Sequence, residues 1–140
     1  MKKMMLIIMI CCCLITGCSS GEGTVTFVQI KDLFEQHGVP LVEQTEVNPE
    51  SVFGRTYNDV SPERFSIDEN ESISIYVYLS SKAANKGFKE FEDKTATAGV
   101  VPHTIHRVGN VLLFHITDSA ALDKRVERAL EDLQSLTNKK

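Results

Sequence analysis

Apolar residues begin to recur at helical spacing about 25 residues into the chain. Thr26 is followed three positions later by Gln29, the arrangement of a capping box, in which two side chains satisfy backbone groups at the start of a helix. The apolar positions that share one helical face are Phe27, Ile30, Leu33 and Phe34. Gly38 suits the end of a helix, so the sequence predicts a helix over residues 27–37.

Strict alternation of apolar and polar residues predicts a strand over residues 72–80. One face of this strand carries Ile73, Ile75, Val77 and Leu79, and the other carries Ser72, Ser74, Tyr76 and Tyr78. Tyrosine offers a large apolar area with a polar tip, so an open second face would make Tyr76 and Tyr78 a binding platform. The competing interpretation is that a helix covers both tyrosines.

The stretch between the first helix and this strand is irregular. Pro40 stops the helix, and residues 41–47 predict a short edge strand. Residues 48–70 are rich in proline, glycine, asparagine and aspartate, which predicts a long loop with a strand near residues 64–67. Long loops are uncommon and often functional, so this segment is one place to expect a binding surface.

Two further helices are predicted in the second half of the chain. Ser80 or Ser81 is the expected N-cap of the first, which should end near Gly99. Its inward face holds Ala84, Phe88, Phe91 and Thr95. Asp118 or Ser119 is the expected N-cap of the last helix. Its apolar stripe is Leu122, Val126, Ala129, Leu130, Leu133 and Leu136.

Between these two helices, residues 101–116 form two extended runs around Gly109-Asn110, a two-residue hairpin signal. With that turn, His106 opposes Leu113, and His115 becomes its diagonal neighbour on the same face, ~7–8 Å away at the backbone. We interpret the two histidines as part of a partly exposed sheet surface. The alternative is that a metal ion or a shared proton joins them.

The order of these elements predicts an α+β fold. A chain of 140 residues has room for one compact domain, here residues 26–138. We expect a mostly antiparallel sheet of about four strands packed with about three helices.

The N-terminus has the three parts of an export signal. Lys2 and Lys3 precede an apolar run that extends from Met4 to about Ile15. A spanning helix needs ~20 apolar residues, so this run is too short to stay in the membrane. We therefore expect residues 1–17 to be removed as a signal peptide.

The sequence Leu-Ile-Thr-Gly-Cys at residues 14–18 resembles the lipobox of bacterial lipoproteins. The resemblance covers the whole short motif but ends at Cys18, and residues 24–140 resemble no family. It implies a diacylglyceryl thioether on Cys18 and cleavage just before it, on the outer face of a membrane. Two acyl chains hold a protein firmly on a bilayer. Residues 18–25 are then the lipidated cysteine and a flexible polar tether.

Charge and cysteine usage exclude several classes of function. Removal of Lys2 and Lys3 with the signal leaves 13 basic residues against 19 acidic ones, a net charge of −6. An acidic domain gains little from phosphate backbones, so no nucleic-acid partner is expected. Cys18 is the last cysteine, so the domain beyond it can form neither an internal disulfide nor a cysteine-based metal site.

Motifs for catalysis and cofactor binding are missing from the sequence. There is no Gly-x-Ser-x-Gly, P-loop, dinucleotide glycine motif or zinc-binding helix motif. The acidic segment 68–72 faintly resembles a calcium loop but lacks its central glycine, so we interpret it as a solvated turn. His103 falls on the opposite strand face from His106 and His115, which argues against a three-histidine metal site. We expect no catalytic residues, no bound metal and no cofactor.

These observations predict a lipid-anchored, non-catalytic accessory domain that docks on an envelope protein or a small ligand at the membrane surface. Cys18 is its lipidation site, and Tyr76, Tyr78, His106 and His115 are its candidate binding residues. One alternative is a small hydrolase directed at the cell wall or at lipid that uses carboxylates or the hairpin histidines. Another is a solute- or metal-binding lipoprotein.

Overall fold

The computed structural model describes residues 23–46, 48, 50–119 and 121–139. The predicted signal peptide, the lipobox and Cys18 lie outside the described residues. In chain order the elements are α1 (Phe27–Gln36), β1 (Val42–Glu43), the 3-10 helix η1 (Val52–Gly54), β2 (Glu63–Asp68), β3 (Glu71–Val77), α2 (Ser81–Thr95), β4 (His103–Val108), β5 (Val111–Thr117) and α3 (Lys124–Thr137).

The strands form one sheet in the order β1-β2-β3-β5-β4, and each neighbouring pair is antiparallel. The predicted α+β fold in one small domain is confirmed, with five strands where about four were expected. The additional strand comes from the irregular region, because the edge strand β1 has only two residues and β2 lies between turn residues.

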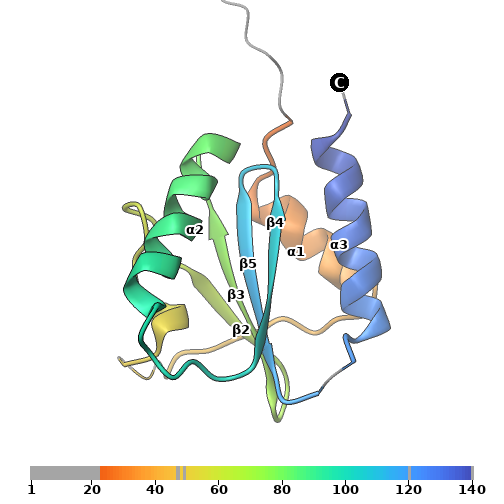
Figure 1. The fold of residues 1–140 in the computed structure, drawn as a ribbon. Helices are drawn as coiled ribbons and strands as arrows, with labels where there is room; N and C mark the ends of the chain where they lie inside the picture. Colours follow the sequence, from red (N-terminus) through yellow and green to blue (C-terminus); the bar gives the residue numbers. More distant parts are fainter. Residues whose placement is uncertain (1–22, 47, 49, 120, 140) are drawn as a thin grey trace, which may run out of the picture.

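The helices cover both faces of the sheet (Figure 1). Helices α1 and α3 lie on one face and α2 lies on the other. The α3-facing core is built mainly from Ile30, Phe34, Ile73, Ile75, Leu113, Val126, Ala129 and Leu133. The α2-facing core is built from Phe53, Tyr57, Tyr76, Tyr78, Ala84, Phe91, Leu112 and Phe114. The central strands β3 and β5 are therefore buried on both sides, which suits the apolar run of β5, whereas β3 alternates apolar residues with serine and tyrosine.

Local sequence signals place several elements correctly. The side chain of Thr26 accepts a hydrogen bond from the backbone of Gln29, and the Gln29 side chain accepts one from the backbone of Thr26, so the capping box of α1 is present. Ser80 caps α2 through the backbone N–H of Ala83. In the hairpin, Val108 pairs with Val111. Gly109, in the turn between them, has a φ of 54°, a conformation that glycine adopts readily.

Three predicted boundaries are wrong. Strand β3 ends at Val77, so Leu79 does not continue the inward face and is 96% exposed. Helix α2 ends at Thr95, four residues before Gly99. Helix α3 begins at Lys124 with Asp123 as its N-cap, because the Ser119 hydroxyl bonds to the backbone of Ala121 and makes a turn instead of a helix start.

The segment that precedes β2, predicted as a loop, is largely packed against the sheet and α2. Phe53 and Tyr57 are buried in the α2-facing core, and Tyr57 pairs with Val60 in an isolated bridge. Asn58 and Asp59 turn the chain between them with positive φ angles of 46° and 62°. The segment is therefore a structural part of the domain more than an open binding loop.

The described part of the chain holds no helix that is both long enough and apolar enough to cross a membrane.

Candidate functional site

The predicted histidine pair lies on the α3-facing side of the sheet. The register of β4 and β5 pairs His106 with Leu113 and Thr104 with His115, as the hairpin turn predicted. The two histidines are therefore diagonal neighbours on one face. His103 lies on the other face, where its ring packs 4.9 Å from that of Phe53.

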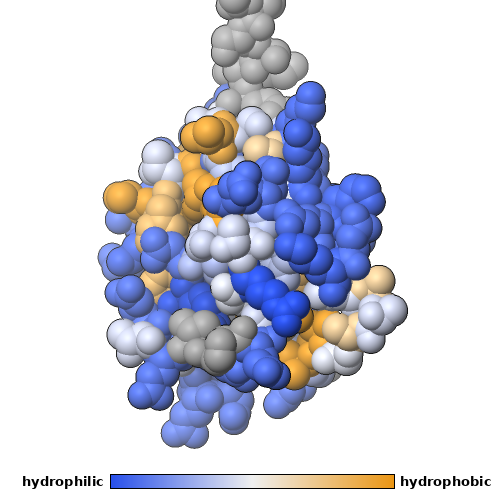
Figure 2. Space-filling model, turned by 90° about the vertical axis from the view of Figure 1, so that its left-hand side faces the viewer, coloured by the Kyte–Doolittle hydropathy of each residue, from blue (hydrophilic) through white to orange (hydrophobic). Residues whose placement is uncertain are grey.

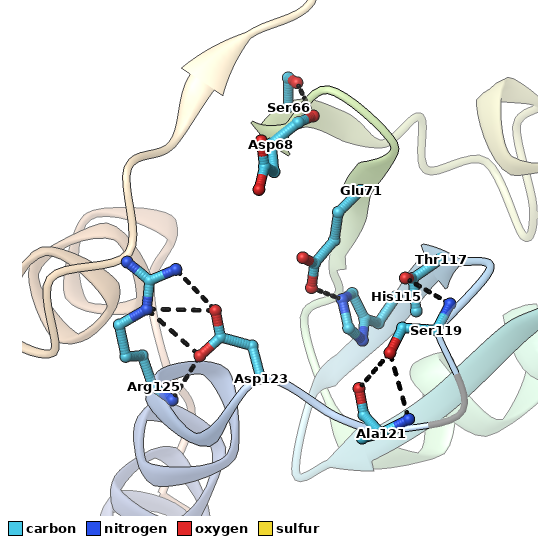
Figure 3. A network of polar contacts seen from close by, with 9 residues as sticks. All are labelled: Ser66, Asp68, Glu71, His115, Thr117, Ser119, Ala121, Asp123 and Arg125. Atoms are coloured by element: carbon cyan, nitrogen blue, oxygen red, sulfur yellow. Dashed lines mark hydrogen bonds and ion pairs between the residues drawn. The ribbon is translucent and has the colours of Figure 1, made fainter.

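The expectation of a partly exposed surface is wrong for His115, which is completely buried and pairs with a carboxylate. Its Nε2 pairs with Oε1 of Glu71, whose side chain is 18% exposed at the start of β3 (Figure 3). The two side chains meet because β3 and β5 pair Ile73 with His115 and Glu71 with Thr117. The second ring nitrogen of His115, Nδ1, is buried without a partner among the described residues. An unpaired polar atom of this kind is uncommon and indicates strain or function.

His106 is half buried, and its Nε2 also has no partner among the described residues. Burial lowers the pKa of His106 below its ordinary value of 6.5, and repulsion from His115 lowers it further. At neutral pH the imidazole of His106 is therefore uncharged, and it offers one hydrogen-bond donor and one acceptor.

A groove of about 560 Å³ opens beside His106, between β4 and α3. Its walls are formed by Ile105, His106, Arg107, Val108, Leu122, Glu127, Leu130, Glu131 and Gln134. The groove combines apolar side chains with charged ones from the exposed face of α3. An apolar hollow with a few polar groups is the usual form of a binding site.

The N-terminus of α3 is held in place next to this region. The Asp123 carboxylate accepts hydrogen bonds from the backbone N–H and the guanidinium of Arg125, which lowers the pKa of Asp123 (Figure 3). The same guanidinium donates to the backbone oxygen of Gly38 at 2.9 Å, just after α1. Arg125 therefore joins the two helices that cover this face, and its positive charge is paired with the Asp123 carboxylate.

A second, acidic hollow of about 380 Å³ lies where β3 begins and β5 ends. It is lined by Asp68, Glu69, Asn70, Glu71, Thr117, Asp118 and Ser119. Among the described residues, no group of three or more histidine, cysteine or acidic side chains is placed to hold a metal ion.

The two histidines differ in what their rings can contact. A histidine that activates a nucleophile must meet it, but Glu71 occupies Nε2 of His115 and the ring has no exposed surface. His106, in contrast, lines a groove, although its unpaired Nε2 is itself buried. The geometry offers a groove for a bound group beside a neutral imidazole.

The proposed platform of Tyr76 and Tyr78 does not exist, because both side chains are buried under α2, at 0% and 3% exposure. The Tyr76 hydroxyl donates to the backbone oxygen of Arg55 at 2.8 Å, and the Tyr78 hydroxyl donates to that of Tyr57 at 3.2 Å. Burial raises the pKa of both hydroxyls. These tyrosines hold the segment before β2 against the sheet, and Gly87 of α2 leaves space for the Tyr78 ring.

Asn110 is a structural residue that sequence reasoning placed only in a turn. Its side-chain oxygen accepts from the backbone N–H of Val25 at 2.8 Å. Its side-chain nitrogen donates to the backbone oxygens of Val25 at 3.0 Å and Tyr78 at 2.7 Å. We call this set of contacts the Asn110 clamp. It fixes the point at which the chain enters the domain.

No protein-family model, no curated protein and no solved structure matches the chain. Its function is therefore inferred from its own residues.

Proposed function

We propose that this protein is an extracytoplasmic lipoprotein anchored through Cys18, and that its folded part is a non-catalytic domain that docks on an envelope protein. The observation that carries the proposal is the lipobox at residues 14–18, followed within seven residues by the Asn110 clamp at Val25. At ~3.5 Å per residue, the chain between Cys18 and Val25 spans at most roughly 25 Å. The domain is thereby kept within reach of other proteins at the same membrane.

The groove between β4 and α3 is the surface that supports docking. Leu122 is partly buried and Val108 and Leu130 are buried around it, and Glu127, Glu131 and Gln134 are exposed along α3. Apolar side chains surrounded by polar ones are typical of a surface that receives part of another protein. An apolar side chain of the partner would fill the groove, and polar atoms beside it would pair with the exposed side chains of Glu127, Glu131 and Gln134.

The proposal is tested by photo-crosslinking in intact cells. A photoreactive amino acid replaces Gln134 in the groove, and a matched control replaces Glu92, which is exposed on α2 at the other face. We expect the probe at residue 134 to capture one envelope protein and the probe at residue 92 to capture none. The Cys18→Ala form should lose that product. Mass spectrometry showing Cys18 without lipid, or equal labelling from both positions, would overturn the proposal.

A second candidate function is the binding of a small solute in the same groove. It is favoured by the lining of the groove, which combines apolar side chains with a few polar and charged ones. Native mass spectrometry of protein extracted in mild detergent, compared with the same protein after unfolding and refolding, tests it. A mass that is lost on refolding would identify a solute, and two identical masses would contradict this candidate.

A further inference from the structure

The chain enters the domain at one end of the sheet, the end that carries the β4–β5 hairpin (Figure 1). Val25 is held there by the Asn110 clamp. Gly23, two residues earlier, packs against Leu136 and Thr137 at the C-terminal end of α3. We call this the tether end of the domain. Its position is fixed by hydrogen bonds and packing, so an anchor a few residues before Gly23 has to lie on the same side.

The tether end exposes apolar side chains that the core does not use. Leu79, in the turn between β3 and α2, is 96% exposed, and Val28, in the first turn of α1, is 65% exposed. Leu79 and Phe27 border a hollow of about 360 Å³ that also contains Val25. Figure 2 shows hydrophobic residues gathered directly below the point where the chain leaves the domain. A side chain as large as leucine loses favourable burial when it stays in water.

The exposed charges around Leu79 are mainly basic. Lys82 follows the N-terminus of α2. Arg107 lies beside the same helix, with its guanidinium 4.4 Å from the centre of the Phe88 ring, and it lines a hollow with Ser81, Asn85 and Gly109. Lys86 lies one turn along α2, and Lys139 follows α3. No acidic residue lines either hollow at this end, although Glu22 lies in the tether itself.

The opposite end of the sheet carries the acidic charge. The hollow there contains Asp68, Glu69, Glu71 and Asp118. Strand β3 joins the two ends, so the turns at Asn70 and at Leu79 lie ~30 Å apart at ~3.3 Å per residue. A domain with a net charge near −6 thus has a basic, apolar end exactly where its tether begins, and it is oriented by any anionic surface.

We infer that the tether end is a lipid-contacting surface: Leu79 inserts between lipids of the bilayer while Lys82, Lys86 and Arg107 contact anionic headgroups. The inference rests on the proposed lipid anchor. Gly23 is the fifth residue after Cys18, a reach of at most roughly 18 Å. The membrane surface therefore lies within about that distance of Gly23, on the side of the domain that carries Leu79, and the groove beside α3 is left open to the side for a protein partner.

The insertion of Leu79 and the contacts of the basic side chains both favour the orientation in which the tether end faces the membrane. Burial of one leucine side chain favours the membrane-contacting orientation by about tenfold or more. Each lysine near an anionic surface adds about fivefold at low salt. The contact is weak without the anchor, because one inserted side chain and three charges do not hold a protein on a bilayer.

The test uses the mature lipidated protein in vesicles and a fluorophore that brightens in an apolar environment. Cys18 is the last cysteine and its sulfur is blocked by lipid, so Leu79→Cys gives a single labelling position. The matched control is Val101→Cys, an exposed apolar residue at 55% just before β4, at the far end of the domain. Vesicles contain either phosphatidylcholine alone or phosphatidylcholine with phosphatidylglycerol.

We expect the label at residue 79 to brighten severalfold and to be quenched by spin-labelled acyl chains, most strongly with phosphatidylglycerol. The label at residue 101 should behave as in water. In Lys82→Glu/Lys86→Glu protein, the fraction of labels at residue 79 that are in lipid should fall by about tenfold or more at low salt.

Two outcomes overturn the inference alone. In one, Cys18 carries lipid and the label at residue 79 is as exposed to water as the one at residue 101. In the other, residue 79 is shielded in native membranes but not in pure lipid vesicles, which would assign this end to a protein partner. If the mass of the same preparation shows that Cys18 carries no lipid, the anchor fails as well, and both proposals are overturned together.

Discussion

Strand β5 has a buried polar residue near each of its ends, and the two are satisfied in different ways. Asn110, 3% exposed at the tether end, exchanges its side-chain hydrogen bonds with backbone groups of Val25 and Tyr78. His115, fully buried at the acidic end, pairs through Nε2 with Glu71 and leaves Nδ1 unpaired.

The difference separates structure from candidate function. Backbone groups do not titrate, so the Asn110 clamp holds over a wide pH range and serves the fold. The His115 contact depends on a carboxylate, and the neighbouring His106 lines an open groove. A buried polar group without a partner in the protein is satisfied by water or by a bound group.

Of the two buried polar residues, Asn110 is expected to contribute more to stability, so the larger loss is expected for Asn110→Ala. The substitution leaves three buried backbone groups of Val25 and Tyr78 without partners, and we expect a loss of about 3 kcal/mol in the free energy of unfolding. Urea denaturation of the mature domain measures it. Asn70→Ala, in an exposed turn, is the matched control and should change stability by less than about 0.5 kcal/mol. A loss below about 1 kcal/mol at Asn110 would show that water replaces the clamp.

A smaller effect is expected at the other end of β5. Glu71→Ala removes the carboxylate that pairs with buried His115, and we expect a loss of about 2 kcal/mol at neutral pH. Glu69→Ala, in the same acidic turn but exposed, should be nearly neutral. In His115→Leu protein, Glu71→Ala should cost much less, because the pair is already absent. Equal losses from Glu71→Ala with and without His115 would contradict the assigned pairing.

These two contacts also show where sequence reasoning stops. The hairpin register and the shared face of His106 and His115 followed from the Gly109-Asn110 turn, because a two-residue loop fixes the pairing of its strands. The contact between Glu71 and His115 depends on pairing between strands 44 residues apart, and the contact between Val25 and Asn110 joins residues 85 apart. No local pattern encodes such pairings.

Errors in the predicted site have the same origin. Alternation along residues 72–80 correctly separated the two faces of β3 but could not show that α2 and the segment around Tyr57 cover Tyr76 and Tyr78. The groove beside α3 was equally hidden, because it depends on how α3 lies against β4. Helix caps depend on local sequence. The cap of α1 was predicted correctly, and Ser80, the cap of α2, was one of the two residues predicted.

The pH dependence of stability tests the histidine face further. Because the pKa of His106 is lower in the folded domain than its ordinary value of 6.5, the unfolded chain binds a proton first as the pH falls. Stability should therefore be full above about pH 7 and should decrease as the pH falls through 6.5. In His106→Leu protein this part of the decrease should be missing, as urea denaturation at several pH values would show. An unchanged pH profile would contradict the assigned burial of the neutral ring.

The smallest change in the free energy of unfolding is expected for a substitution of Leu79 at the tether end. Alternation would place Leu79 inside with Ile75, but Leu79 is 96% exposed and Ile75 is 1% exposed. Leu79→Ala should therefore change the free energy of unfolding by less than about 0.5 kcal/mol, whereas Ile75→Ala should cost about 2–5 kcal/mol. Urea denaturation of the two variants in detergent compares them. An unchanged free energy of unfolding in Leu79→Ala would show that the fold does not use this leucine, which leaves it available for the lipid contact, and a large loss would place it in the core.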